Sequence, residues 1–169
     1  SQLDGRKDAI GEAIQTIKAA DKGVKAITSL IETARGLLSQ ARGTTDTTAL
    51  DDLADQYTEV LSQLDDIASD SGYKGVNLLD NDTLSVAFNE DNSTNITISG
   101  FTATATGLGI DAAADNTAID SASEIDTIEG SLNDALVTLR TESLTLASNL
   151  AILSTRESFI TDMNNVLTE

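Results

Sequence analysis

Clusters of acidic residues are the part of this chain best suited to chemistry, since carboxylates can hold metal ions. Asp80-Asn81-Asp82 begins like a calcium-binding loop. Such a loop needs Gly at its sixth position and Glu at its twelfth, and neither is present. A second polar run, Asn89-Glu90-Asp91-Asn92, lies between two apolar segments, where a turn is expected. We therefore expect solvated turns and no metal site.

Catalytic groups of other kinds are scarce. The chain has no His and no Cys, which removes the commonest general base, metal ligand and thiol nucleophile. Asp65 and Asp66 are adjacent, and adjacent residues of a helix point in different directions, so they do not share a site. Gly107-Leu108-Gly109 lacks the Lys-Ser/Thr of a phosphate-binding loop. We expect neither an enzyme nor a bound cofactor.

The composition narrows the possible partners. A net charge of −18 argues against nucleic acid, and no apolar run is long enough to span a membrane. Residues 1–43 hold seven of the ten basic residues against five acidic ones, so the excess acid lies in the rest of the chain. This asymmetry could steer packing within or between copies, or it could simply reflect a solvated surface.

Apolar residues seven apart run through the last third of the chain. A strict seven-residue repeat keeps one side of a helix facing a partner, and neither Pro nor Gly interrupts it after Ser131. We predict a helix over 122–169, roughly 70 Å long at about 1.5 Å per residue, capped by Ser121 or Ser123. The predicted packing residues are Ile125, Leu132, Leu139, Leu146, Leu153, Ile160 and Leu167.

The same repeat predicts a first helix over 1–43 that ends at Arg42-Gly43. Ala recurs beside the larger residues, which lets a partner helix approach closely. Its predicted packing residues are Ile10, Ile17, Val24, Ile31 and Leu38. A second helix is predicted over 48–71, antiparallel to the first because the connecting turn is short.

The period changes to two within residues 72–121, which predicts an irregular connection and a β-hairpin with one apolar face. The hairpin residues are Leu84, Val86, Phe88, Ile96 and Ile98. Leu108 and Ile110 could form a further strand or act as anchors. The scattered aromatic residues are interpreted as core residues: Tyr57, Tyr73, Phe88, Phe101 and Phe159. The expected fold is mainly α, a single domain over 1–169 built as an elongated antiparallel bundle with the hairpin at one end.

This order of parts resembles bacterial flagellin. The similarity is carried by Gly72-Tyr73-Lys74-Gly75-Val76-Asn77-Leu78-Leu79, by the hairpin opening Asp82–Phe88, and by a closing helix in which an Arg/Phe-containing run precedes Asn164-Asn165. Lack of Cys, Pro, Trp and His is also typical of that family. The resemblance covers essentially the whole chain.

The resemblance implies a secreted subunit of the extracellular flagellar filament that assembles with copies of itself for swimming motility. It also implies an export chaperone and a cap protein as partners. The chain looks like a core-domain fragment without the terminal polymerisation segments of the family. The alternatives are a hook–filament junction protein of the same superfamily and a secreted helical adhesin or binding module, which would stay monomeric.

One difference from the family concerns innate immunity. Flagellins that activate Toll-like receptor five carry a Gln-Arg pair and a nearby Leu on the first helix. An ungapped alignment puts Ile31-Glu32 at the pair and Gly36 at the Leu. A reversed charge and a lost apolar contact would weaken such an epitope. We therefore expect poor activation of this receptor by the full-length protein in a reporter-cell assay.

Overall fold

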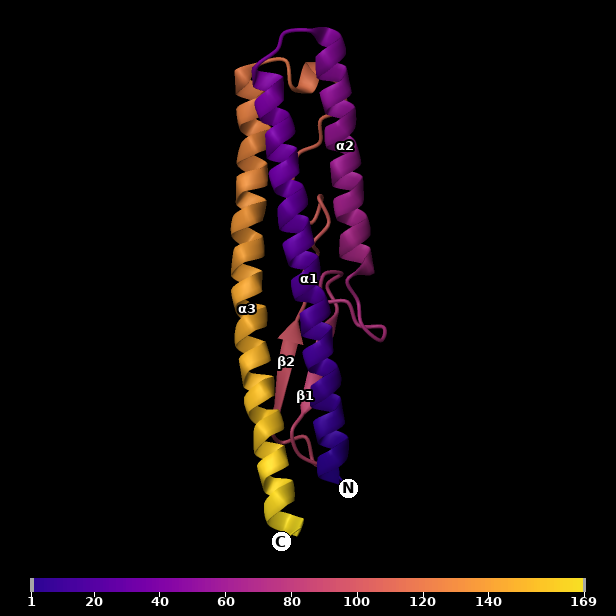
Figure 1. The fold of residues 1–169 in the computed structure, drawn as a ribbon, viewed down its shortest axis with the longest axis vertical. Helices are drawn as coiled ribbons and strands as arrows, with labels where there is room; N and C mark the ends of the chain where they lie inside the picture. The colour runs from indigo at the N-terminus through magenta and orange to yellow at the C-terminus, as the bar shows by residue number, and fades with distance from the viewer. Residues whose placement is uncertain (1, 169) are drawn as a thin grey trace.

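The computed structural model describes residues 2–168, which form three long helices and a small hairpin. The helices are α1 (Gln2–Arg42), α2 (Thr47–Asp70) and α3 (Ala122–Thr168), and a 3-10 turn, η1, covers Asn116–Ala118. Helices α1 and α3 run antiparallel, and α2 runs antiparallel to α1 along its second half (Figure 1). The mainly α, elongated antiparallel bundle predicted from the sequence is thus confirmed.

The helix boundaries follow local signals. Helix α3 begins after Ser121, whose Oγ accepts a hydrogen bond from the backbone N–H of Glu124 at 3.2 Å, so Ser121 is the cap. Without Pro, and without Gly after Gly130, nothing in the sequence stops it before Thr168. Each predicted helix begins and ends within one or two residues of the observed one.

One core cluster includes residues of all three helices, the hairpin and residues 100–121, and the seam between α1 and α3 is a large part of it. Every predicted packing residue of both helices is buried except Leu167, which is 68% exposed. That prediction was wrong because Leu167 lies near the end of α3 in an open hollow beside Gln2 and Leu3, where no large side chain of residues 2–168 covers it. The Ala residues beside the α1 series, such as Ala20 and Ala34, are fully buried, which lets neighbouring helices approach closely.

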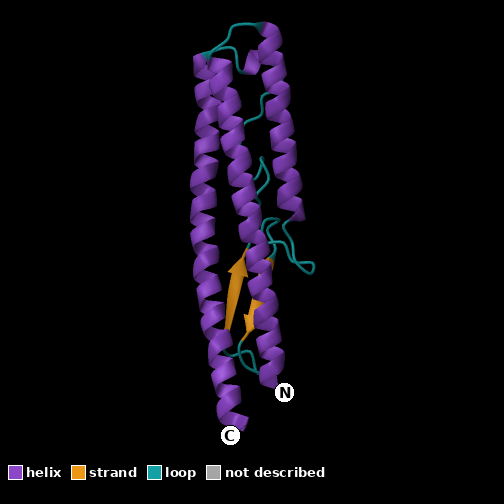
Figure 2. Ribbon diagram, viewed as in Figure 1, coloured by secondary structure: helices purple, strands orange, loops and turns teal. Residues whose placement is uncertain are grey.

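The hairpin fills the half of the bundle that α2 does not reach (Figure 2). Strands β1 (Thr83–Ala87) and β2 (Asn95–Ser99) pair antiparallel, with Leu84 opposite Ile98 and Val86 opposite Ile96. Val86 and Ile98 are buried, while Leu84 and Ile96 are half-buried. Phe88 was predicted as a strand residue but lies just after β1. It is nevertheless buried, beneath the guanidinium of Arg156 at 4.4 Å from the ring centre.

Residues 100–121 run back along α2, which supplies several of their polar partners. The Tyr57 hydroxyl donates to the backbone carbonyl of Asp111 at 2.5 Å, and burial together with the Asp111 charge raises the pKa of Tyr57. Asp51 and Asp65 accept backbone N–H groups from this segment at 3.0 and 2.8 Å. Leu108 and Ile110 are buried anchors and form no strand.

Two glycines of α1 are expected to respond oppositely to Ala. At Gly23 a Cβ would lie 2.1 Å from Ser71 Oγ and 2.6 Å from Leu79 Cδ1, whereas at Gly36 it would meet nothing within 4 Å. Overpacking costs about 1–3 kcal/mol and removing a mid-helix Gly returns about 0.5–1 kcal/mol.

Gly23→Ala should therefore lower the free energy of unfolding, and Gly36→Ala should raise it. Urea denaturation of both variants, followed by circular dichroism, checks this pair. A Gly23→Ala protein as stable as Gly36→Ala would contradict the close approach of α1 to Ser71.

Candidate functional site: exposed faces of the long helices

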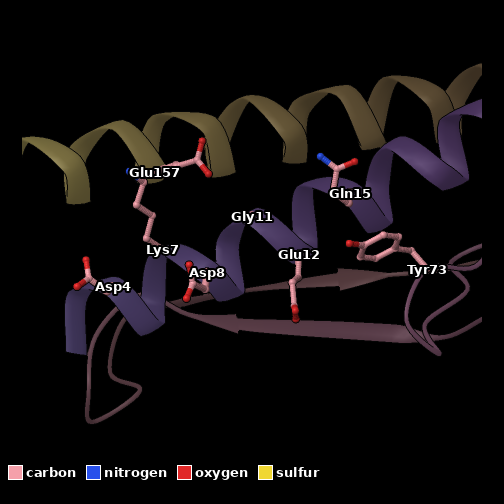
Figure 3. Close-up of a pocket in the computed structure, with 8 residues that line it drawn as sticks. All are labelled: Asp4, Lys7, Asp8, Gly11, Glu12, Gln15, Tyr73 and Glu157. Atoms are coloured by element: carbon pink, nitrogen blue, oxygen red, sulfur yellow. The ribbon is translucent and has the colours of Figure 1, made fainter. Parts of the chain in front are cut away.

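Polar hollows on the surface offer no recognisable chemistry. One, of about 650 Å³, is lined by residues of α1 with Tyr73 and Glu157. In Figure 3 the Lys7 side chain extends toward α3 and the Glu12 side chain points toward the hairpin. Glu12 is engaged by Lys74, whose Nζ lies 2.8 Å away. Within residues 2–168, no group of three or more acidic side chains is placed to hold a metal ion.

The acidic residues singled out in the sequence serve turns and connections. Asp82 accepts the backbone N–H of Asn77 at 2.8 Å and so closes the turn between them. In the hairpin loop, Asp91 accepts the backbone N–H of Ser93 at 3.0 Å. Hydrogen bonds from the Ser93 side chain and from this N–H lower the pKa of Asp91. Asp65 binds the returning segment, and the neighbouring Asp66 is exposed. Asp82 and Asp91 thus lie in turns, as predicted, whereas Asp65 and Asp66 lie on the surface of α2.

An exposed apolar stripe on α3 is the most unusual surface feature. It is composed of Val137, Leu144, Ile152, Phe159 and Val166, with exposed fractions of 56%, 68%, 43%, 53% and 64%. We call these residues the outer stripe. Large apolar side chains scattered singly on a surface are ordinary, whereas these five recur every seven or eight residues along one helix. Helix α3 is thus apolar both toward α1 and toward solvent.

The spacing keeps the outer stripe on one side of a nearly straight helix. Val137 and Val166 are 29 residues apart, which is about eight turns at 3.6 residues per turn. The outer stripe escaped the sequence prediction because the buried seven-residue series accounts for the repeat by itself. Phe159 was interpreted as a core residue, which was wrong: it lies one position from Ile160 and therefore about 100° around the helix.

The predicted receptor epitope is only partly on the surface. Glu32 and Gly36 are exposed, but Ile31 is fully buried as one of the α1 packing residues. Ile31 is therefore not accessible to a receptor in the folded chain, and the poor activation expected from the sequence stays a prediction. The two residues that follow Ile31, Glu32 and Thr33, are both exposed.

Comparison with known proteins finds the similarity in structure alone. No protein-family model and no curated protein sequence matches the chain. The crystal structure of Bacillus cereus flagellin matches with a TM-score of 0.73 and 19% sequence identity, over 92% of this chain and 88% of that one. Within residues 2–168 no helix has the length and apolar character needed to cross a membrane. Three long helices, the placement of the hairpin and this match together show that the chain has a flagellin-like fold.

Proposed function

We propose that this chain is a structural subunit of a bacterial flagellar filament, secreted and assembled outside the cell with copies of itself. The outer stripe of α3 carries the proposal. A helix that buries one apolar side within its own molecule and exposes a second one has a surface to place against another molecule. In a filament, that other molecule is a second copy of the same chain.

The energetic argument rests on repetition. Burying apolar surface stabilises by roughly 25 cal/mol per Å², so a row of five large side chains along one helix can favour association at each contact. Identical contacts repeated by a non-closing rotation generate an open helical polymer. An export chaperone and a cap protein are the further partners we propose, because the flagellin-like fold fits a secreted filament subunit.

Electron microscopy of the full-length protein under salting-out conditions tests the function. Long tubes of constant diameter are the expected result. Monomers that persist at high protein and salt concentration would favour a binding module or adhesin. A protein that adds to the end of a preformed hook but does not extend into tubes would favour the hook–filament junction protein.

A further inference from the structure

Helix α1 has one open side, and three of its four lysines lie there. From Gln15 to Glu32 its exposed positions recur at alternating steps of three and four residues, so they form one line along the helix. Lys18, Lys22 and Lys25 occupy successive positions of that line, and we call them the basic stripe. The other exposed positions nearby are Gln15, Ser29 and Glu32.

Two of the three lysines of the basic stripe form no ion pair within the described part of the chain. Arg42 pairs with Asp126 and Glu129 at one end of the α1–α3 seam, and Lys74 pairs with Glu12 near the hairpin. By contrast, within residues 2–168 neither Lys18 nor Lys22 forms an ion pair. Lys25 contacts Asp21 at 2.9 Å, yet its side chain remains 76% exposed.

Helix α2 presents the opposite charge. It contains no Lys or Arg, and its exposed side carries an acidic stripe of four carboxylates: Asp52, Asp55, Glu59 and Asp66. None of the four forms an ion pair within the described residues. Asp51 and Asp65, which do have backbone partners, face the returning segment instead.

We propose, building on the function above, that the basic stripe of α1 contacts the acidic stripe of α2 on a second copy. Both stripes follow the same three-and-four spacing, so charges can meet at several successive turns when the two helices lie alongside each other. The second copy is the fitting partner because it necessarily carries the complementary surface, whereas the rest of this strongly acidic chain repels its neighbours.

The symmetry of the contact follows from the charges. A basic stripe placed against its own copy would bring like charges together, and so would an acidic stripe. The contact therefore joins two different faces, so two copies joined by one such contact keep one unused basic stripe and one unused acidic stripe. Such head-to-tail pairing extends to rings or open helices and does not stop at a dimer, as a filament requires.

Reversing the charge of each stripe in turn tests the proposal, and each of the two variants serves as a control for the other. Two variants of the full-length protein are compared with the wild type by electron microscopy and by the concentration above which polymer sediments. One variant reverses the basic stripe: K18E/K22E/K25E. The other reverses the acidic stripe: D52K/E59K/D66K. Each alone should need an at least tenfold higher concentration to polymerise, because both of its faces then have the same sign.

An equimolar mixture of the two variants should polymerise near the wild-type concentration. One variant has two acidic stripes and the other has two basic stripes, so every contact between them joins opposite charges. Recovery in the mixture also shows that both variants fold. Variants that polymerise separately like the wild type, or a mixture no better than its components, would overturn the pairing. A third variant, T45E/T47E/T48E, adds negative charge at the α1–α2 turn and should polymerise like the wild type.

Cysteine cross-linking locates the contact directly, because the native chain has no Cys. Under oxidation, a mixture of Lys22→Cys and Glu59→Cys, or of Lys22→Cys and Asp66→Cys, should give disulfide-linked heterodimers. Lys22→Cys alone should give little homodimer. If wild-type protein forms no filament, the proposed function fails. In that case the same mixtures at high concentration still test the pairing, and absence of both heterodimers overturns it.

Discussion

Leu139→Ala should lower the free energy of unfolding by about 2–5 kcal/mol, whereas Leu144→Ala should change it by no more than about 0.5 kcal/mol. The two substitutions remove the same atoms from the same helix. Leu139 is 1% exposed in the α1–α3 seam, so its truncation leaves a cavity, while Leu144 is 68% exposed and leaves none. Denaturant titration of the two proteins measures the difference.

A useful internal check is the slope of the titration, which reports the surface exposed on unfolding. It should be the same in both proteins if each still unfolds as one unit. Equal stability losses for Leu139→Ala and Leu144→Ala would contradict the arrangement in which α3 buries its strict seven-residue series against α1. Circular dichroism before titration confirms that both variants keep the helical content of the wild type.

Leu144→Glu should raise the polymerisation concentration of the full-length protein at least tenfold while leaving the stability of the monomer almost unchanged. Burying a Leu side chain is worth about 1.5–3 kcal/mol, and each 1.4 kcal/mol is a factor of about ten in an equilibrium. A Glu at the same place loses that gain and adds negative charge to a chain of net charge −18. Sedimentation of polymer against protein concentration gives the measurement.

Thr145→Glu is the matched control for this charge. It introduces the same side chain one residue further on, about 100° around the helix, at a position that is also exposed. The control should polymerise more readily than Leu144→Glu. If both variants polymerise like the wild type, the outer stripe does not take part in assembly, and another surface of the chain must supply the contacts.

Much of the fold could be predicted because its signals are local. Each signal depends on residues close together in the sequence. These signals are the seven-residue periodicity, the absence of Pro, a Ser cap, and the change at Leu84 to alternating apolar and polar residues. They predicted where the helices begin and end and that a hairpin lies between the second and third helices. The flagellin-like arrangement followed from the order of these parts, because short turns leave few ways to place the helices.

The surfaces proposed for assembly were harder to predict, since exposure depends on what lies opposite. Lys18 and Arg42 belong to the same basic helix, but only Arg42 meets carboxylates of α3. The sequence could therefore show an asymmetry of charge without showing which charges remain unpaired. To tell paired charges from unpaired ones, one must know where residues more than eighty positions apart lie in space, such as Arg42 and Asp126.

The sequence by itself determined which sides of each helix are apolar, and the tertiary structure decided which of those sides are covered. Leu146 and Leu167 belong to the same series, yet Leu146 is 5% exposed and Leu167 68%. Ile31, by contrast, was predicted both to pack and to occupy a position of a divergent receptor epitope, and its complete burial places it in the packing between helices. The physical reason is that periodicity belongs to one helix, whereas burial requires a second element at the right distance, and that placement is set by the whole chain.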